Sequence, residues 1–377
     1  MGKIRCIDDK SYDVESKSIL ESLEGKNLNL LIGAGASQPF LKDLKLNNSS
    51  VTFEDIFELS TQDKNNYPRV YSYLCACYLF NSLAYGTYET ISKEDDRVCN
   101  DVKKNYETLI NNLYKILMGN SIQIPKRVNF FTTNYDMFFE YSFDVLSKSN
   151  PNIFFNDGSY GFVKKKISST RFHIKVTSVG IDSRYDLEMP MFNLIKLHGS
   201  LNWHVDDKDG LLIKNNNICD ELFSKEEKIE IKKLDKLVHD LPLDSITETI
   251  DNSIKNDYSK YEDSLNKLAI IKPCKRKFSE TVLEEHYYQL LRILSQELER
   301  ENSVLICFGF SFKDEHIVSI VKRSLKNPFL LMYIFCYDKE ATDYCSEEFK
   351  GYNNVIIIGA KYRKIDFEFF NEILGAK

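Results

Sequence analysis

His198 is the residue whose type and context best suit acid–base catalysis. It stands in Leu197-His198-Gly199-Ser200, at the end of an apolar run that begins at Phe192. An imidazole, with an ordinary pKa of about 6.5, accepts a proton near neutral pH and can serve as a general base. The alternative is a histidine that only packs, as most single histidines do. His204 is a weaker candidate for the same role, and three histidines are expected to be structural: His173, His239 and His286.

Asn134 lies in a second polar turn, Thr132-Thr133-Asn134-Tyr135-Asp136, which follows the apolar run from Val128. An amide there can bond sugar hydroxyls or hold an attacking water without adding charge. The alternative is a helix cap in which Asn134 or Asp136 bonds its own backbone.

A third turn, Gly33-Ala34-Gly35-Ala36-Ser37, has the composition of a phosphate-binding loop. Glycines let the backbone approach a phosphate closely, and a following helix offers unpaired N–H groups. Gln38 and Pro39 stand where a dinucleotide fingerprint has its third glycine, and the Gly-Lys-Ser/Thr of a P-loop is absent. A tight strand-to-helix turn is therefore the alternative.

These turns follow short apolar runs of strand length, which alternate with helical patterns. Strands that end in small or polar residues and alternate with helices predict a doubly wound, Rossmann-like parallel sheet that binds ligands at its carboxyl ends. The expected strands are Leu28 to Ile32, Val128 to Thr132, Phe192 to Leu197, Val304 to Phe308, Leu330 to Cys336 and Val355 to Ile358.

Two further regions are expected to be helical. Residues of about 53–119 carry apolar stripes at helical spacing, and residues of about 220–268 form a charged helical insertion. The insertion faces solvent or a partner; the alternative is a solvated lobe without a specific role. With 377 residues, the chain is expected to form one domain over residues 1–377 with this small helical lobe attached.

Composition excludes several classes of protein. A net charge of −6 gives no support for direct nucleic-acid binding or for binding to anionic membranes. No apolar stretch reaches the roughly 20 residues of a membrane helix, and the first residues lack a secretory segment. Nine scattered cysteines indicate free thiols in a reducing compartment. A cytoplasmic protein is expected.

The order of four motifs resembles the sirtuin family, particularly its divergent bacterial branch of NAD hydrolases used in antiphage defence. The motifs are Gly-Ala-Gly-Ala-Ser, Thr-Asn-Tyr-Asp, Leu-His-Gly-Ser and a late Gly-Phe-Ser-Phe. The resemblance extends from about Leu28 to Ile358, although only these motifs match closely. It implies a Rossmann-like sirtuin fold.

The resemblance also implies the site. Asn134 and His198 would be catalytic and would hold the water that captures a ribosyl cation after nicotinamide leaves. The residues expected to bind NAD, the substrate, are Gly33, Ala34, Gly35 and Ser37 at the pyrophosphate, Thr133 and Asp136 at the nicotinamide ribose, Gly309 and Ser311 near the adenosine, and Asp338 at its ribose.

Departures from the deacetylating sirtuins narrow the expectation. The two cysteine pairs of their zinc ribbon are missing, so neither zinc nor any other metal site is expected. Gln38-Pro39-Phe40 replaces the Gly-Ile-Pro of deacetylases, which argues against acyl-lysine recognition. An NAD hydrolase is favoured. The alternatives are a module that binds NAD or ADP-ribose without turnover, and a protein deacylase or ADP-ribosyltransferase.

A chain of this length resembles the variety encoded beside a HerA-type hexameric ATPase. The resemblance implies a homo-oligomer, with that ATPase as a partner, whose assembly controls access to the cleft. It implies an antiphage effector that depletes NAD on infection.

Overall fold

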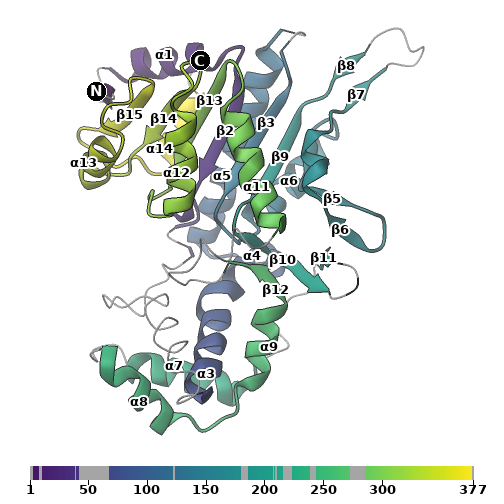
Figure 1. The fold of residues 1–377 in the computed structure, drawn as a ribbon, viewed down its shortest axis with the longest axis vertical. Coiled ribbons are helices and arrows are strands. Elements are labelled where there is room, and N and C mark those ends of the chain that lie inside the picture. Colours follow the sequence, from purple (N-terminus) through teal and green to yellow (C-terminus); the bar gives the residue numbers. More distant parts are fainter. Residues whose placement is uncertain are drawn as a thin grey trace.

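An eight-stranded parallel sheet forms the centre of the molecule in a computed structural model (Figure 1). The structure describes residues 3–7, 11–38, 40–41, 68–121, 124–179, 186–206, 208, 210–214, 223–237, 243–271 and 285–375. The strand order is β1 (Lys3–Ile7), β15 (Val355–Ala360), β14 (Leu331–Phe335), β13 (Ser303–Phe308), β2 (Asn27–Ile32), β3 (Arg127–Thr132), β9 (Met191–Lys196) and β4 (Phe154–Asn156). The prediction of a doubly wound parallel sheet is confirmed.

Alternate side chains of each central strand enter two separate cores. Leu30 of β2 and Ile306 of β13 belong to one core, while Leu31 and Leu305 belong to the other. The first core is covered by α1 (Tyr12–Leu23), α5 (Arg97–Gly119), α6 (Phe138–Ser149) and α14 (Phe367–Gly375). The second is covered by α11 (Glu285–Leu298), α12 (Glu315–Ser324) and α13 (Lys339–Glu348). Both faces of the sheet are thus buried, as near-continuous apolar strands require.

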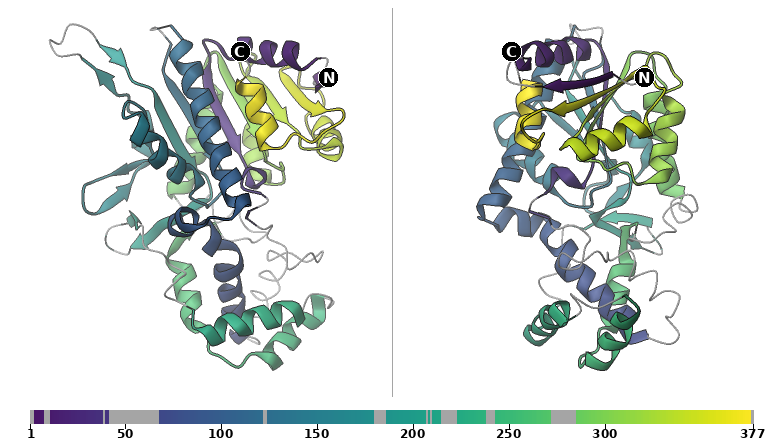
Figure 2. Two further views of the ribbon diagram at one scale, coloured as in Figure 1. Left: turned by 180° about the vertical axis from the view of Figure 1, so that it is seen from behind. Right: turned by 90° about the vertical axis from the view of Figure 1, so that its left-hand side faces the viewer.

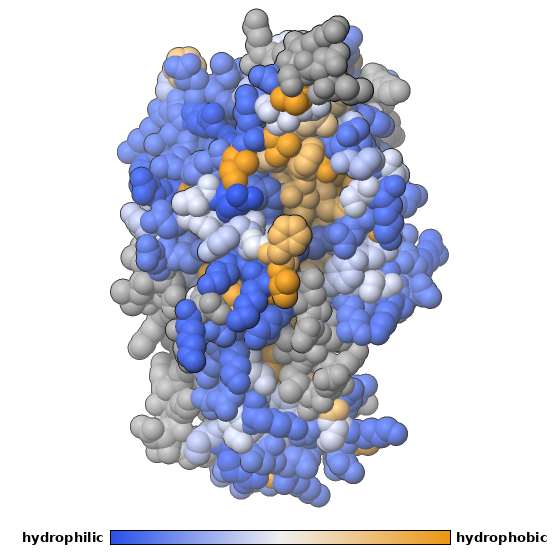
Figure 3. Space-filling model, turned by 90° about the vertical axis from the view of Figure 1, so that its right-hand side faces the viewer, coloured by the Kyte–Doolittle hydropathy of each residue, from blue (hydrophilic) through white to orange (hydrophobic). Residues whose placement is uncertain are grey.

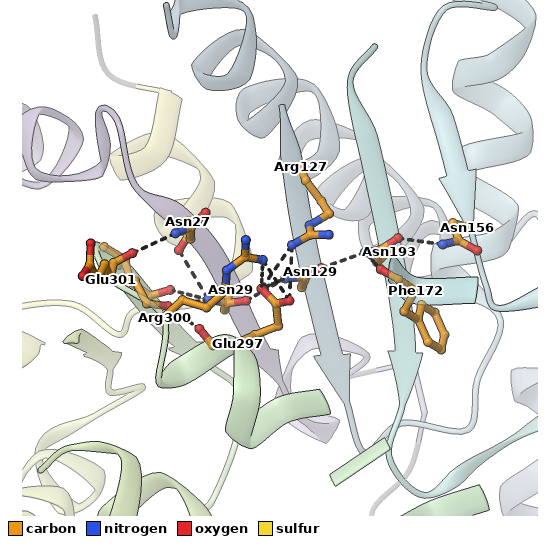
Figure 4. Close-up of polar contacts among 12 residues, drawn as sticks. Asn27, Asn29, Arg127, Asn129, Asn156, Phe172, Asn193, Glu297, Arg300 and Glu301 are labelled. Carbon is orange, nitrogen blue, oxygen red and sulfur yellow. Dashed lines mark hydrogen bonds and ion pairs between the residues drawn. The ribbon is translucent and has the colours of Figure 1, made fainter. Parts of the chain in front are cut away.

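A row of asparagines crosses the sheet on one face (Figure 4). Asn156, Asn193, Asn129 and Asn29 stand opposite one another on neighbouring strands. Each side-chain Nδ2 donates to the Oδ1 of the next amide at 2.8 Å, and Asn29 donates to Ser303 Oγ at 2.9 Å. Since a slip of one residue would break every bond in the row, the amides help to fix the register.

A small antiparallel sheet continues from the carboxyl end of β9. It contains β12 (Leu268–Ile270), β10 (Gly199–Asp206), β11 (Gly210–Ile213), β6 (Lys165–Ile167) and β5 (Ser159–Tyr160), in that order. A separate hairpin pairs β7 (Thr177–Ser178) with β8 (Leu187–Glu188). The side that carries these hairpins is mostly hydrophilic, with apolar surface gathered in a strip (Figure 3).

A helical lobe lies beyond this small sheet, at the opposite end of the molecule from α1 (Figures 1 and 2). It contains α3 (Pro68–Tyr78), the π-helix η2 (Leu79–Leu83), α7 (Lys225–Leu237), α8 (Leu243–Ser253) and α9 (Ser259–Lys267), which share a third apolar core. The lobe thus joins parts of both regions expected to be helical; residues 53–67, 220–222 and 238–242 lie outside the described residues. Among the described helices, none has the length and apolar character needed to cross a membrane.

Candidate functional site

The glycine turn after β2 interlocks with the turn after β13. The N–H groups of Gly33 and Gly35 donate to the carbonyls of Phe308 and Gly309, at 3.1 and 2.9 Å. A Cβ atom on Gly33 would lie 2.5 Å from the Gly309 oxygen, so a larger residue cannot stand there without displacing backbone. Gly309 itself has φ +63°, which favours glycine. Two of the predicted motifs therefore form one structure.

Asn134 ties the turn after β3 to this glycine pair. Its side-chain Nδ2 donates to the Gly33 carbonyl at 3.0 Å and lies 3.3 Å from Ser37 Oγ. Its backbone N–H donates to Thr132 Oγ1 at 3.0 Å, so both ends of the residue are fixed. Asn134 is only 8% exposed and Thr133 beside it is half-buried. The amide thus lies at the junction of three strand ends.

The side chains of Ser37 and Asp136 face inward and support the glycine turn. Ser37 Oγ donates to Asp136 Oδ2 at 2.8 Å and lies 2.9 Å from the Tyr106 hydroxyl. Asp136 Oδ1 accepts the N–H of Phe138 at 3.2 Å, in the first turn of α6. In the predicted binding segment, Ala34 and Gly35 are therefore the exposed residues, while Ser37 is buried.

A buried lysine that the sequence reading overlooked lies beneath the site. Lys196, 1% exposed, forms an ion pair with Glu140 at 2.8 Å and donates to the Asp136 carbonyl at 2.5 Å and to Ser200 Oγ at 2.9 Å. Burial raises the pKa of the Asp136 and Glu140 carboxyls above their ordinary values, and Lys196 opposes this shift. The signal in the sequence was one cation at the end of an apolar strand.

The backbone of His198 is held on two sides. The N–H of Leu197 donates to the Thr132 carbonyl at 2.8 Å, and the N–H of Ile271 donates to the His198 carbonyl at 2.8 Å. Gly199 has φ +90°, and a Cβ there would lie 1.9 Å from the Ala269 oxygen. The glycine after His198 is therefore required by the close approach of β12.

The imidazole of His198 meets a second imidazole, that of His316 in the first turn of α12. Their Nε2 atoms are 3.3 Å apart, and the two residues are 3% and 5% exposed. His198 follows β9 and His316 follows β13, with β3 and β2 between them. The pair therefore reaches across the carboxyl ends of four strands. His316 was not singled out from the sequence, because nothing local in Asp314-Glu315-His316 indicates its distant partner.

The remaining candidates lie around this centre. Ser311 is exposed in the β13–α12 turn, where Gly309 is half-buried. Asp338 caps α13, because its Oδ1 accepts the Ala341 N–H at 3.0 Å. His204 and His286 have pKa values lowered to about 4, chiefly by burial. Within the described ranges, no three His, Cys, Asp or Glu side chains are grouped so as to hold a metal ion.

The arrangement has the chemistry to bind a dinucleotide. Exposed backbone at the glycine turn suits a pyrophosphate, a neutral amide suits sugar hydroxyls, and an imidazole pair can hold and move a proton. These groups follow the carboxyl ends of β13, β2, β3 and β9, the end of the strands at which doubly wound sheets bind ligands.

Comparison with known families places these features in context. A family model described as the SIR2-like domain matches residues 128–357. The match includes Asn134, His198, Gly309 and His316, while the glycine turn precedes it and is joined to it by the contacts above. No curated protein matches the chain. Since the match covers more than half of the sequence, the chain belongs to the SIR2-like domain family and thereby to a group of NAD-related proteins.

Proposed function

We propose that this chain is an NAD glycohydrolase, which cleaves NAD to nicotinamide and ADP-ribose. The observation that carries the proposal is that the turns after β2, β3 and β9 are joined: Asn134 Nδ2 donates to the Gly33 carbonyl, and the N–H of Leu197, next to His198, donates to the Thr132 carbonyl. One ligand with a pyrophosphate and a ribose could therefore contact all three motifs.

The protein's contribution is chiefly positioning. The exposed Ala34 and Gly35 would lie against the pyrophosphate, with Gly309 beside them toward the adenosine. Since the Gly35 N–H already donates to the Gly309 carbonyl, Ala34 would supply the backbone donor. The side-chain oxygen Oδ1 of Asn134 would orient a ribose hydroxyl or the attacking water, while Nδ2 of the same amide keeps its hydrogen bond to the Gly33 carbonyl. His198 would take the proton of that water as it adds to the ribosyl carbon. Orientation of this kind supplies much of the rate enhancement in such reactions.

The group that accepts the ADP-ribosyl unit distinguishes a hydrolase from a deacylase or a transferase. In a hydrolase the acceptor is water. The chain is incubated with NAD, with and without an acetylated peptide, and the products are resolved by mass. We expect free ADP-ribose and nicotinamide at the same rate in both mixtures. Acetyl-ADP-ribose, or a modified protein with no free ADP-ribose, would instead identify a deacylase or a transferase.

A module that binds NAD or ADP-ribose without turnover is the second candidate. The favouring observation is that Asn134 and His198 are both nearly buried, and that each already bonds a protein group. Such a chain would bind NAD, as measured by calorimetry, and release no nicotinamide over hours.

We further propose that the chain acts in antiphage defence in the cytoplasm, as an oligomer with a HerA-type ATPase. The β5–β6 turn supports an interface, because Phe162 and Val163 are 101% and 97% exposed and Lys164 follows them. Gly161 fixes this turn at φ +97°. A Phe162→Ser/Val163→Ser variant is expected to shift the chain to a smaller species by light scattering. An unchanged mass would exclude this turn from the interface.

A further inference from the structure

We propose that His316 is a positioning residue for His198, holding its ring in one orientation and one tautomer. The effect of this pair on catalysis rests on the proposed function, whereas the contact between the two rings rests on geometry alone. It starts from two buried imidazoles whose Nε2 atoms are 3.3 Å apart.

Backbone contacts hold the main chain of His198, and the imidazole of His316 contacts its ring. The carbonyl of His198 is held by Ile271, and Leu197 before it is held by Thr132. Rotation about the side-chain bonds would still move the ring nitrogens. The contact with His316 on α12 restricts this rotation. His316 is itself held in a helical turn where Ile317 and Val318 donate to the Asp314 carbonyl at 3.1 and 3.0 Å.

The contact between two Nε2 atoms also restricts the protons. In a neutral pair one Nε2 carries the hydrogen and the other accepts it, so the two rings must be opposite tautomers. A base at His198 needs a ring nitrogen without a proton. We infer the arrangement in which Nε2–H of His198 donates to Nε2 of His316 and Nδ1 of His198 takes the proton.

The proposed reaction moves one proton from water to His198. One O–H bond of the water breaks and its proton goes to Nδ1 of His198, while the oxygen bonds to the ribosyl carbon that nicotinamide leaves. Nicotinamide departs with the electron pair of the broken C–N bond. His198 is then an imidazolium whose bond to His316 is charge-assisted and therefore stronger. The proton later passes to solvent.

Ring-nitrogen NMR of histidine-labelled protein tests the pair without reference to activity. The chain has six histidines, so single substitutions assign the signals. At a pH of about 8, where a free imidazole is neutral, we expect the Nε2–H tautomer for His198 and the Nδ1–H tautomer for His316. His316→Phe should shift the His198 signals, and the exposed His173→Gln should not. Unshifted His198 signals in His316→Phe would overturn the proposal.

Steady-state kinetics test whether the contact with His316 contributes to nicotinamide release. His316→Phe keeps a ring without nitrogens and should lower kcat for nicotinamide release about ten-fold or more, with KM changed by less than about three-fold. His316→Gln restores a polar partner and should recover part of kcat. If the wild type releases nicotinamide and His316→Phe does so equally fast, positioning is excluded and the hydrolase stands. If the wild type releases no nicotinamide while NMR shows the His198–His316 contact, the proposed hydrolase activity is excluded and the contact between the two rings is retained.

Discussion

Buried charges beneath the site depend on one another. Lys196 lies between the Glu140 carboxylate and the Asp136 carbonyl, and Asp136 in turn accepts from Ser37. Removing one charge from such a group leaves its partner buried and uncompensated, which costs more than the pair contributes. The glycine turn therefore rests on a group of buried charges.

Lys196→Met should destabilise the fold by about 3–5 kcal/mol, because Glu140 loses its cation. The matched control is Lys322→Met, which breaks the partly exposed pair with Glu348 at 2.6 Å and should cost less than about 1 kcal/mol. Urea unfolding of both variants measures the difference. Equal losses would show that Lys196 is not a structural support.

His286 should make the fold sensitive to acid. Burial lowers its pKa to about 4, and its Nε2 has no bonding partner among the described residues. Because the unfolded chain binds this proton at about 6.5, stability falls as the pH drops from there toward 4. His286→Phe keeps the edge contact with Trp203 and should flatten the fall of Tm in this window. An unchanged pH profile, with His173→Gln as control, would contradict this.

Asparagines in the row across the sheet show how strands are aligned. Asn129 donates to Asn29 and to Glu297, and accepts from Asn193. Glu297 also pairs with Arg127 and Arg300, at 3.2 and 3.1 Å, so a charge cluster joins the row at Asn129 (Figure 4). Each member is satisfied only while the others are present.

Asn129→Leu should cost roughly 2–4 kcal/mol, because it leaves buried polar atoms of Asn29 and Glu297 without this donor. Asn156→Leu, at the half-buried end of the row, should cost less than half as much. Chemical denaturation of the two variants gives the comparison. If Asn156→Leu proved as damaging as Asn129→Leu, burial would not explain the role of the row.

Local pattern predicted the central strands to within one or two residues, because apolar runs buried on both faces are unambiguous. The edge strands β1 and β4 were missed, since β4 has only three residues and β1 mixes charges with apolar residues. Local pattern also predicted only part of the candidate site. Asn134 and His198 directly follow predicted strands, so the sequence indicated them as candidates. His316 and Lys196 could not be predicted, because their contacts are with residues on other elements.

At the scale of the whole molecule, the candidate site lies between the large sheet and the helical lobe. Tyr135 marks this junction, since its hydroxyl donates to the Ile271 carbonyl and its own carbonyl accepts from Leu201 at 3.1 Å. The prediction of one domain over residues 1–377 remains a prediction. Local periodicity could not predict that the two helical regions share one core.

Ligand binding should stabilise the whole fold. NAD at about 100 times its Kd adds about 2.7 kcal/mol to a chain that binds it only when folded. We expect NAD to raise the Tm of the wild type. Gly35→Ala should not respond, because its Cβ would lie 2.8 Å from Gly309 Cα and distort the turn. An undiminished shift in Gly35→Ala would remove the glycine turn from the binding site.

Time-resolved mass analysis of NAD mixed with the purified chain tests the central claim most directly, with Asn134→Ala and His198→Ala beside the wild type. The account predicts equal amounts of nicotinamide and ADP-ribose from the wild type, and a loss of at least about a hundred-fold in each variant. Each variant must keep its fold, which matters most for Asn134→Ala because it also loses the bond to Gly33. Full activity in a folded His198→Ala would contradict the account.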